Sequence, residues 1–129
     1  LTLGQLLEAH HAQDRLEMAT SYFWTSRLCG WEMPSSLCAD LAQSALLISK
    51  GAANYRRWLG DRHWAHTSPI EAILNYRPAP WVALRVLKAN IIAGLKSERA
   101  EAAARQDPSW QYSGHWGVIQ LVKIGDELT

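Results

Sequence analysis

The chain has 129 residues, 48% of them hydrophobic and 19% charged, values that are typical of a folded globular domain and exclude a disordered chain. Its two cysteines, Cys29 and Cys38, are too few for a disulfide framework and their spacing matches no zinc motif, so we expect reduced thiols and a cytoplasmic location. No apolar run reaches the roughly 20 residues of a membrane span, so we expect no contact with a membrane.

The pattern of apolar residues predicts a mainly α fold, a compact bundle of four to five helices in one domain over residues 1–129. In this prediction residues 1–106 form the helical core, and residues 107–129 form an aromatic loop followed by a short C-terminal strand or irregular segment. Apolar side chains that recur every three to four residues place helices at residues 3–28, 35–50, 52–59, 69–76 and 80–105.

Local signals support two of the predicted helix starts. Thr2 and Gln5 have the spacing of a capping box, in which each side chain bonds a backbone N–H of the first turn. Ser68, Pro69 and Glu71 combine an N-cap residue, a proline at the first helical position and an acid at the third. Both helices should therefore begin where these residues stand.

Residues 118–124 are the last predicted element. Their β-branched side chains and the glycine that follows favour a strand, with a short helix as the alternative. Because an isolated strand cannot satisfy its backbone, a strand here pairs with another segment or with a second chain. This C-terminal segment is therefore a candidate contact for a protein partner or a homo-oligomer.

The net charge of +1 hides an uneven distribution of charge along the chain. Residues 50–106 contain ten Lys and Arg against four Asp and Glu, whereas the segments on both sides are acidic overall. A locally positive field attracts anions even when the whole chain is nearly neutral. We therefore expect a binding surface within the basic segment.

Arg85, Lys88, Lys96 and Arg99 recur on one side of the predicted helix 80–105, beside its apolar stripe. Cations neutralise phosphates and aromatic rings stack on unpaired bases, so these residues indicate a nucleic-acid-binding face. Its predicted members are Arg56, Arg57, Arg62, Arg77, Trp81, Arg85, Lys88, Lys96 and Arg99. The alternative is that the cations are solvated and the tryptophans belong to the core.

We therefore favour a non-enzymatic nucleic-acid-binding or accessory protein that contacts DNA or RNA, needs no cofactor, and acts alone or as a subunit of a larger complex. One alternative is a protein-binding module, an inhibitor or an assembly subunit, that docks an acidic partner on the same cations.

A second alternative is enzymatic. Arg57 and His63 are separated by five residues, and this spacing resembles the R-x4-6-H catalytic motif of the HEPN ribonucleases, which are helical bundles of about this size. The resemblance implies that Arg57 stabilises phosphate charge while His63 moves the proton of the attacking 2′-hydroxyl. A Gly-rich phosphate loop and a nucleophile elbow are both absent from the sequence.

His10, Asp14 and Glu17 fall on one arc of the predicted helix 3–28 and are ligand types that hard metals accept. A metal site would need ligands from a second helix, and residues 35–50 offer only Asp40. We therefore expect no metal, and favour an internal hydrogen-bonded cluster or a partly exposed helix edge.

Overall fold

The computed structural model describes residues 2–125, and within them the protein is a mixed α/β structure rather than the predicted mainly α bundle. Residue 1 and the last four residues of the predicted segment 107–129 lie outside the described range. In chain order the elements are α1 (Leu3–Ala12), η1 (Tyr22–Thr25), η2 (Gly30–Glu32), α2 (Ser35–Ala42), β1 (Leu47–Lys50), α3 (Ala52–Trp58), α4 (Ile70–Ile73), β2 (Trp81–Val86), α5 (Ser97–Gln106) and β3 (Gly117–Val122). The two η elements are short 3-10 helices.

Strands of the described chain form one mixed sheet in the order β1-β2-β3. β1 pairs in parallel with β2, so that Leu47 lies beside Trp81 and Lys50 beside Leu84. β3 pairs antiparallel with β2 over the whole length of both strands. The prediction of a C-terminal strand is therefore confirmed, and the partner of that strand is β2 of the same chain. A contact with a second chain through this segment stays a prediction.

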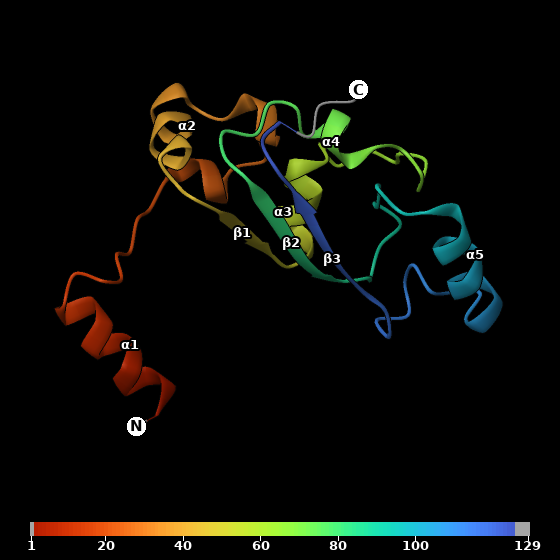
Figure 1. Cartoon of the computed structure of the whole chain (residues 1–129), viewed down its shortest axis with the longest axis horizontal. Coiled ribbons are helices and arrows are strands. Elements are labelled where there is room, and N and C mark those ends of the chain that lie inside the picture. Colours follow the sequence, from red (N-terminus) through yellow and green to blue (C-terminus); the bar gives the residue numbers. More distant parts are fainter. Residues whose placement is uncertain (1, 126–129) are drawn as a thin grey trace.

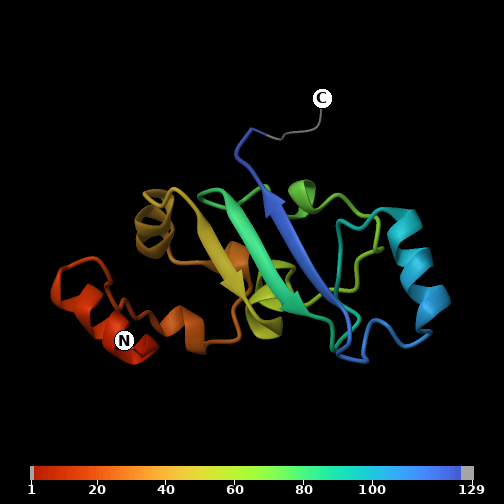
Figure 2. The same cartoon turned by 60° about the horizontal axis from the view of Figure 1, so that its bottom comes forward.

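Helix α3 packs against one face of the sheet, while the opposite face is open. In Figure 2 the three strands face the viewer with α3 behind them, and no helix of the described chain crosses in front. Burial along β2 shows the same division, because Trp81, Ala83 and Arg85 are buried whereas Leu84 and Val86 are exposed. The buried face belongs to the main core, which consists of Tyr55, Trp58, Leu59, Ile70, Leu74, Trp81, Ala83, Ile91, Ala93 and Val122.

The predicted long helix over residues 80–105 is wrong. β2 occupies its first part, an irregular segment follows, and α5 begins only at Ser97. Leu, Ala, Arg and Lys have high helix propensity, but hydrogen bonding and packing on both sides of β2 outweigh this preference. Gly94 also has a φ of +72°, which no α-helix contains. The predicted helix 35–50 fails in the same way, since α2 ends at Ala42 and β1 follows.

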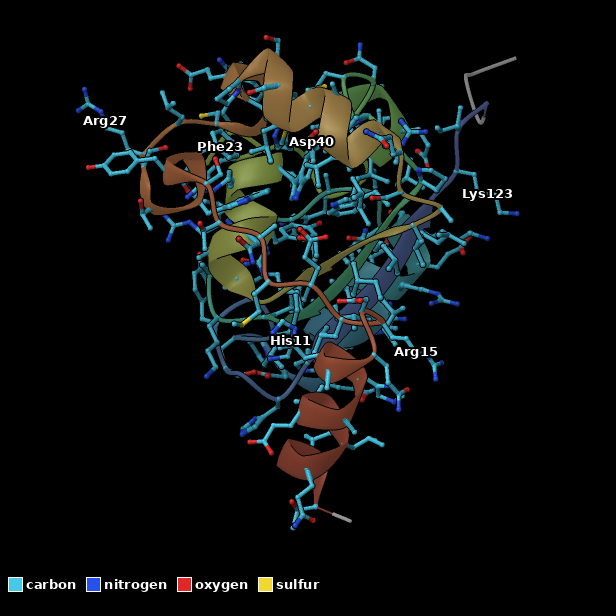
Figure 3. All side chains as sticks on the ribbon, turned by 90° about the vertical axis from the view of Figure 1, so that its left-hand side faces the viewer. His11, Arg15, Phe23, Arg27, Asp40 and Lys123 are labelled. Atoms are coloured by element: carbon cyan, nitrogen blue, oxygen red, sulfur yellow. The ribbon has the colours of Figure 1, made fainter. Side chains whose placement is uncertain are left out.

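The predicted helix 3–28 is much shorter than expected. α1 stops after 10 residues, and Asp14 turns the chain with a φ of +54°. α1 buries no side chain and stands apart from the sheet at the end of an extended segment (Figure 1). Figure 3 shows His11 and Arg15 where α1 meets this segment. The predicted capping box of Thr2 and Gln5 is confirmed, with both of its hydrogen bonds present.

Two further predicted helices are confirmed in shorter form, α3 within residues 52–59 and the single turn α4 within residues 69–76. The side chain of Ser68 does not cap α4. Instead the Ser68 carbonyl accepts a hydrogen bond from the Gly94 N–H at 2.8 Å. Among the described residues no helix is both long and apolar enough to cross a membrane.

Replacing Gly94 by alanine should destabilise the protein more than replacing Gly51. Both glycines have left-handed φ angles, +72° and +91°, which cost alanine about 1–2 kcal/mol. At Gly94 the new Cβ would also lie 2.8 Å from Cβ of Ile70, whereas nothing lies within 4 Å at Gly51. We expect urea unfolding to give losses of about 2–5 kcal/mol for Gly94→Ala and about 1–2 kcal/mol for Gly51→Ala. Equal losses would contradict the close packing at Gly94.

Candidate functional site

The carboxyl ends of β1 and β2 lie at the same edge of the sheet, because the two strands are parallel. Here the chain passes from Lys50 through Gly51 into α3, and the Gly51 N–H donates to the carbonyl of Leu84 at 2.9 Å. Asn54 donates from Nδ2 to the carbonyl of Lys50 at 3.0 Å. Space above Gly51 is open, since nothing lies within 4 Å of a Cβ placed there. Ligands of α/β proteins bind outside the carboxyl ends of parallel strands, so this edge is the first candidate site.

Two exposed lysines, Lys50 and Lys88, belong to this edge. Lys50 is the last residue of β1, and Lys88 comes just after the end of β2. The ion pairs found within residues 2–125 involve one arginine of α3 and one of α5, so neither lysine has a carboxylate partner there. Unpaired ammonium groups leave this edge positively charged and attractive to anions.

The segment after α5 closes one side of the space around Lys88. A Cβ placed at Gly114 would lie 3.5 Å from Cε of Lys88. Asp107 holds this segment, accepting from the N–H and the hydroxyl of Ser109 at 2.8 and 2.7 Å and from Nε1 of Trp116 at 3.1 Å. Hydrogen bonds from serine hydroxyls, that of Ser109 first, lower the pKa of Asp107 to about 2. The carboxylate that organises the segment is therefore charged at neutral pH.

A polar cluster connects the same segment to the residues that follow β2. Nε2 of His66 lies 3.0 Å from Oδ1 of Asn90 and 3.0 Å from Nε2 of Gln111, and the ring of Trp110 packs edge-on against the imidazole. One ring nitrogen either donates or accepts, so a single tautomer satisfies only one of the two amides as they are oriented. No motif in the sequence indicated this cluster.

Arg85 was predicted to contact nucleic acid, but it is 4% exposed. Its guanidinium donates to the carbonyl of Ala89 at 2.8 Å and to that of Ile91, and it lies over the ring of Tyr55 at 4.5 Å. Burial lowers the pKa of Arg85. The side chain therefore holds the irregular segment after β2 against the sheet and is not available to a ligand.

Arg57 is likewise a structural residue. Its guanidinium donates to the carbonyls of Phe23, Trp24, Ser26 and Leu28 at 2.9, 3.1, 2.9 and 2.9 Å. The segment around Phe23, labelled in Figure 3, is thus fixed to α3 by one side chain. His63, the other residue of the ribonuclease hypothesis, is exposed in the connection after α3. No hydrogen bond of the described chain links it to Arg57.

The other predicted contacts are divided between structural and exposed positions. Arg56 makes two hydrogen bonds with Asp61, at 2.6 and 2.9 Å, which lower the pKa of that carboxylate. Arg62 lies over the ring of Trp31 at 5.1 Å, and Arg77 donates to the carbonyls of Leu74 and Lys123. Trp81 is 0% exposed and cannot stack on a base. Lys88, Lys96 and Arg99 remain exposed without a carboxylate partner in residues 2–125.

The described residues include no group of three or more His, Cys, Asp or Glu side chains that could hold a metal ion. His10 lies on α1, but Asp14 and Glu17 fall beyond its end. The common helical arc on which the metal hypothesis depended is therefore not formed.

A model of the damage-control phosphatase ARMT1-like domain matches residues 2–103. The chain belongs to this family. It is 38% identical to the damage-control phosphatase ARMT1 of Xenopus laevis over an alignment of 102 residues, which covers 70% of this chain and 23% of that protein. It is 34% identical to the Mus musculus protein of the same name over an alignment of 124 residues, which covers 93% of this chain and 28% of that protein. The Homo sapiens relative is 36% identical over 102 residues.

The chain spans about a quarter of the length of the curated relatives it matches. The match overturns the prediction of a non-enzymatic nucleic-acid-binding or accessory protein, because the family is one of phosphatases. The alternatives of a protein-binding module and a HEPN-like ribonuclease are overturned by the same finding. One sequence signal could have indicated the site at the end of β1. A short apolar run precedes Lys50 and Gly51 and a helix follows them, and a strand, a glycine and a helix in this order are typical of ligand sites in α/β proteins.

Replacing Arg57 or its neighbour Arg56 by alanine tests whether the first arginine stabilises the fold more than the second. Arg57→Ala leaves four carbonyls without their donor, whereas Arg56→Ala breaks one exposed ion pair. We expect the first change to lower the free energy of unfolding by about 2–4 kcal/mol and the second by about 1 kcal/mol or less. Urea unfolding curves of the two variants measure this difference. Similar small losses would show that the segment around Phe23 does not depend on Arg57.

Proposed function

We propose that this chain contributes phosphate-binding side chains to an enzyme that hydrolyses a phosphate ester, with the carboxyl edge of β1 and β2 as the binding site. The observation that carries the proposal is the pair of exposed lysines, Lys50 and Lys88, at the edge where the two parallel strands end. Neither is paired with a carboxylate within residues 2–125. Membership of a phosphatase family supports a phosphoryl group as the anion.

Hydrolysis of a phosphate ester joins a water oxygen to phosphorus and breaks the phosphorus–oxygen bond to the alcohol, which leaves with a proton taken from the water. In the transition state negative charge builds up on the leaving oxygen and the transferring phosphoryl group, so fixed cations placed there lower the barrier. In the proposed site Lys50 and Lys88 supply these cations. Asn54 uses one of its two Nδ2 hydrogens on the carbonyl of Lys50, which leaves the other to donate to a phosphoryl oxygen. Gly51 leaves room for the ligand to approach the backbone.

The open face of the sheet supports a larger enzyme. Ile48, Ile119 and Leu121 are 66%, 80% and 53% exposed on this face, yet sheets with parallel strands are normally covered on both sides. A cavity of about 280 Å³ lies beside the free edge of β1. Ser49 Oγ and Trp81 Nε1 belong to residues that line it, and both are buried without a partner in the described chain. We assign this face and edge to the part of the phosphatase fold outside the matched quarter.

We also place the protein in the cytoplasm. Cys29 and Cys38 are both free thiols, and free cysteines are typical of reducing compartments.

Lys88→Ala should weaken the proposed phosphate site. The substitution removes one of the two unpaired cations at the carboxyl edge, so we expect kcat/KM for phosphate esters to fall about tenfold or more, equivalent to about 1.4 kcal/mol. Phosphate release from a panel of phosphate monoesters measures this effect. Binding of inorganic phosphate, followed by NMR shifts of the Gly51 and Asn54 backbone, measures it without turnover.

Lys123→Ala is the matched control, because Lys123 follows β3 at the opposite end of the sheet and its side chain points outward (Figure 3). It removes the same charge and should change kcat/KM and phosphate affinity less than twofold. If both variants lost kcat/KM and phosphate affinity equally, the effect would come from net charge alone. If Lys88→Ala lost neither, Lys88 would not belong to the site.

A substitution that introduces a charge on the open face should affect the association of this chain and not its folding. Ile119 is 80% exposed, so Ile119→Lys should change the free energy of unfolding of the isolated chain by no more than about 0.5 kcal/mol. The same change should suppress concentration-dependent association of the chain, which sedimentation velocity measures. A monomer at every concentration, with or without the substitution, would argue against an apolar contact on this face.

A further inference from the structure

A second cavity, of about 600 Å³, lies between α5 and β3. Figure 1 shows α5 on the β3 side of the sheet. The volume falls within the range of roughly 300–1,000 Å³ found for small-molecule sites. Leu87 is buried and lines this cavity, whereas the next residue, Lys88, is exposed and does not. The lining of the cavity shares no residue with the proposed phosphate site of Lys50, Gly51, Asn54 and Lys88.

Cations at the start of α5 line this cavity, whereas the acids of α5 do not. Lys96 and Arg99 line it, whereas the acids Glu98 and Glu101 do not. Glu101 instead lies 3.9 Å from Arg105, on a part of the helix outside the lining. Within residues 2–125 neither Lys96 nor Arg99 is paired with a carboxylate. One wall of the cavity therefore carries two positive charges that the described chain does not neutralise.

Apolar and aromatic groups form most of the remaining wall, and its large side chains are those of Leu87, Leu95, Trp110, Trp116, Val118 and Ile119. Trp110 is 5% exposed, and the ring of Trp116 is held by its bond to Asp107. Gln120 also lines the cavity, but its amide is already bonded to the Tyr55 hydroxyl and to a backbone carbonyl. The lining thus combines large apolar side chains with two cations.

We propose that this cavity binds a small organic anion. Its anionic group contacts Lys96 and Arg99, and its planar or branched apolar body packs against Trp110, Trp116 and Leu87. This arrangement uses both features of the cavity, because an apolar ligand alone would leave the cations without a counterion and a small inorganic anion would leave the apolar wall in water. The site does not depend on the proposed phosphatase reaction.

The test uses naphthalene-1-sulfonate as the probe, an aromatic anion that a phosphatase cannot hydrolyse. Calorimetry gives its affinity, and indole N–H resonances of Trp110 and Trp116 locate the binding. We expect the double variant Lys96→Gln with Arg99→Gln to weaken binding at least tenfold. Both residues are exposed, so the fold should be retained, as far-UV circular dichroism checks. Ala102→Leu, which fills part of the cavity without changing its charge, should weaken binding to a similar degree.

Arg105→Gln is the control, because Arg105 is a cation of α5 that does not line the cavity. The affinity of this variant for naphthalene-1-sulfonate should stay within twofold of that of the unchanged protein. Lys88→Ala should also leave the affinity unchanged, which separates this site from the proposed phosphate site. Equal loss in Arg105→Gln, equal binding of the neutral 1-naphthalenemethanol, or no binding at millimolar probe would each overturn the proposal. If the chain instead self-associated through β3 and did not bind the probe, the cavity would be a contact between two copies of the chain. The proposal would then fail as well.

Discussion

Backbone pairing on both sides of β2 is the constraint on which the rest of this structure depends. Because β1 runs parallel to β2, the chain between them must return from one end of the sheet to the other. Helices α3 and α4 lie in this return segment, and α3 packs on the face where Trp81 and Ala83 are buried. The same parallel pairing brings the ends of both strands to one edge. The location of Lys50, Gly51 and Lys88 is therefore a consequence of strand direction.

Two arginines stabilise the irregular segments around this sheet. Backbone carbonyls outside helices and strands still need donors when they are removed from water, and a guanidinium offers five N–H groups in a fixed plane. Arg57 serves four carbonyls of the segment before α2, and Arg85 serves two after β2. Some arginines of a basic segment can thus have a structural role, because they bond backbone carbonyls of the same chain. The cations that remain for ligands are fewer than the composition indicates.

Exposure of the apolar sheet face supports the proposal that this chain is one part of a larger enzyme. The chain spans about a quarter of the curated damage-control phosphatases it matches. Within residues 2–125 it has a free edge on β1 and an uncovered face across all three strands. Parallel pairing such as that of β1 with β2 occurs mostly in sheets that are covered on both faces. The two cavities differ accordingly. The smaller one borders the free edge of β1 and is lined by residues with buried polar atoms that have no partner in residues 2–125, whereas the larger one lies between α5 and β3.

The sequence by itself determined the features that depend on neighbouring residues. The capping box of Thr2 and Gln5, the helices α3 and α4, and the C-terminal strand all follow from short-range propensity and hydrogen bonding, and all are present. Lys88 was also predicted from sequence as an anion-binding residue, and the structure shows it exposed. The tertiary structure alone decided that residues 47–50 and 81–86 are strands. Short apolar runs fit a helix or a strand equally well until a pairing partner distant in sequence is in place, as Leu47 is for Trp81. It also decided which arginines are buried, because burial depends on carbonyls that only folding brings within reach.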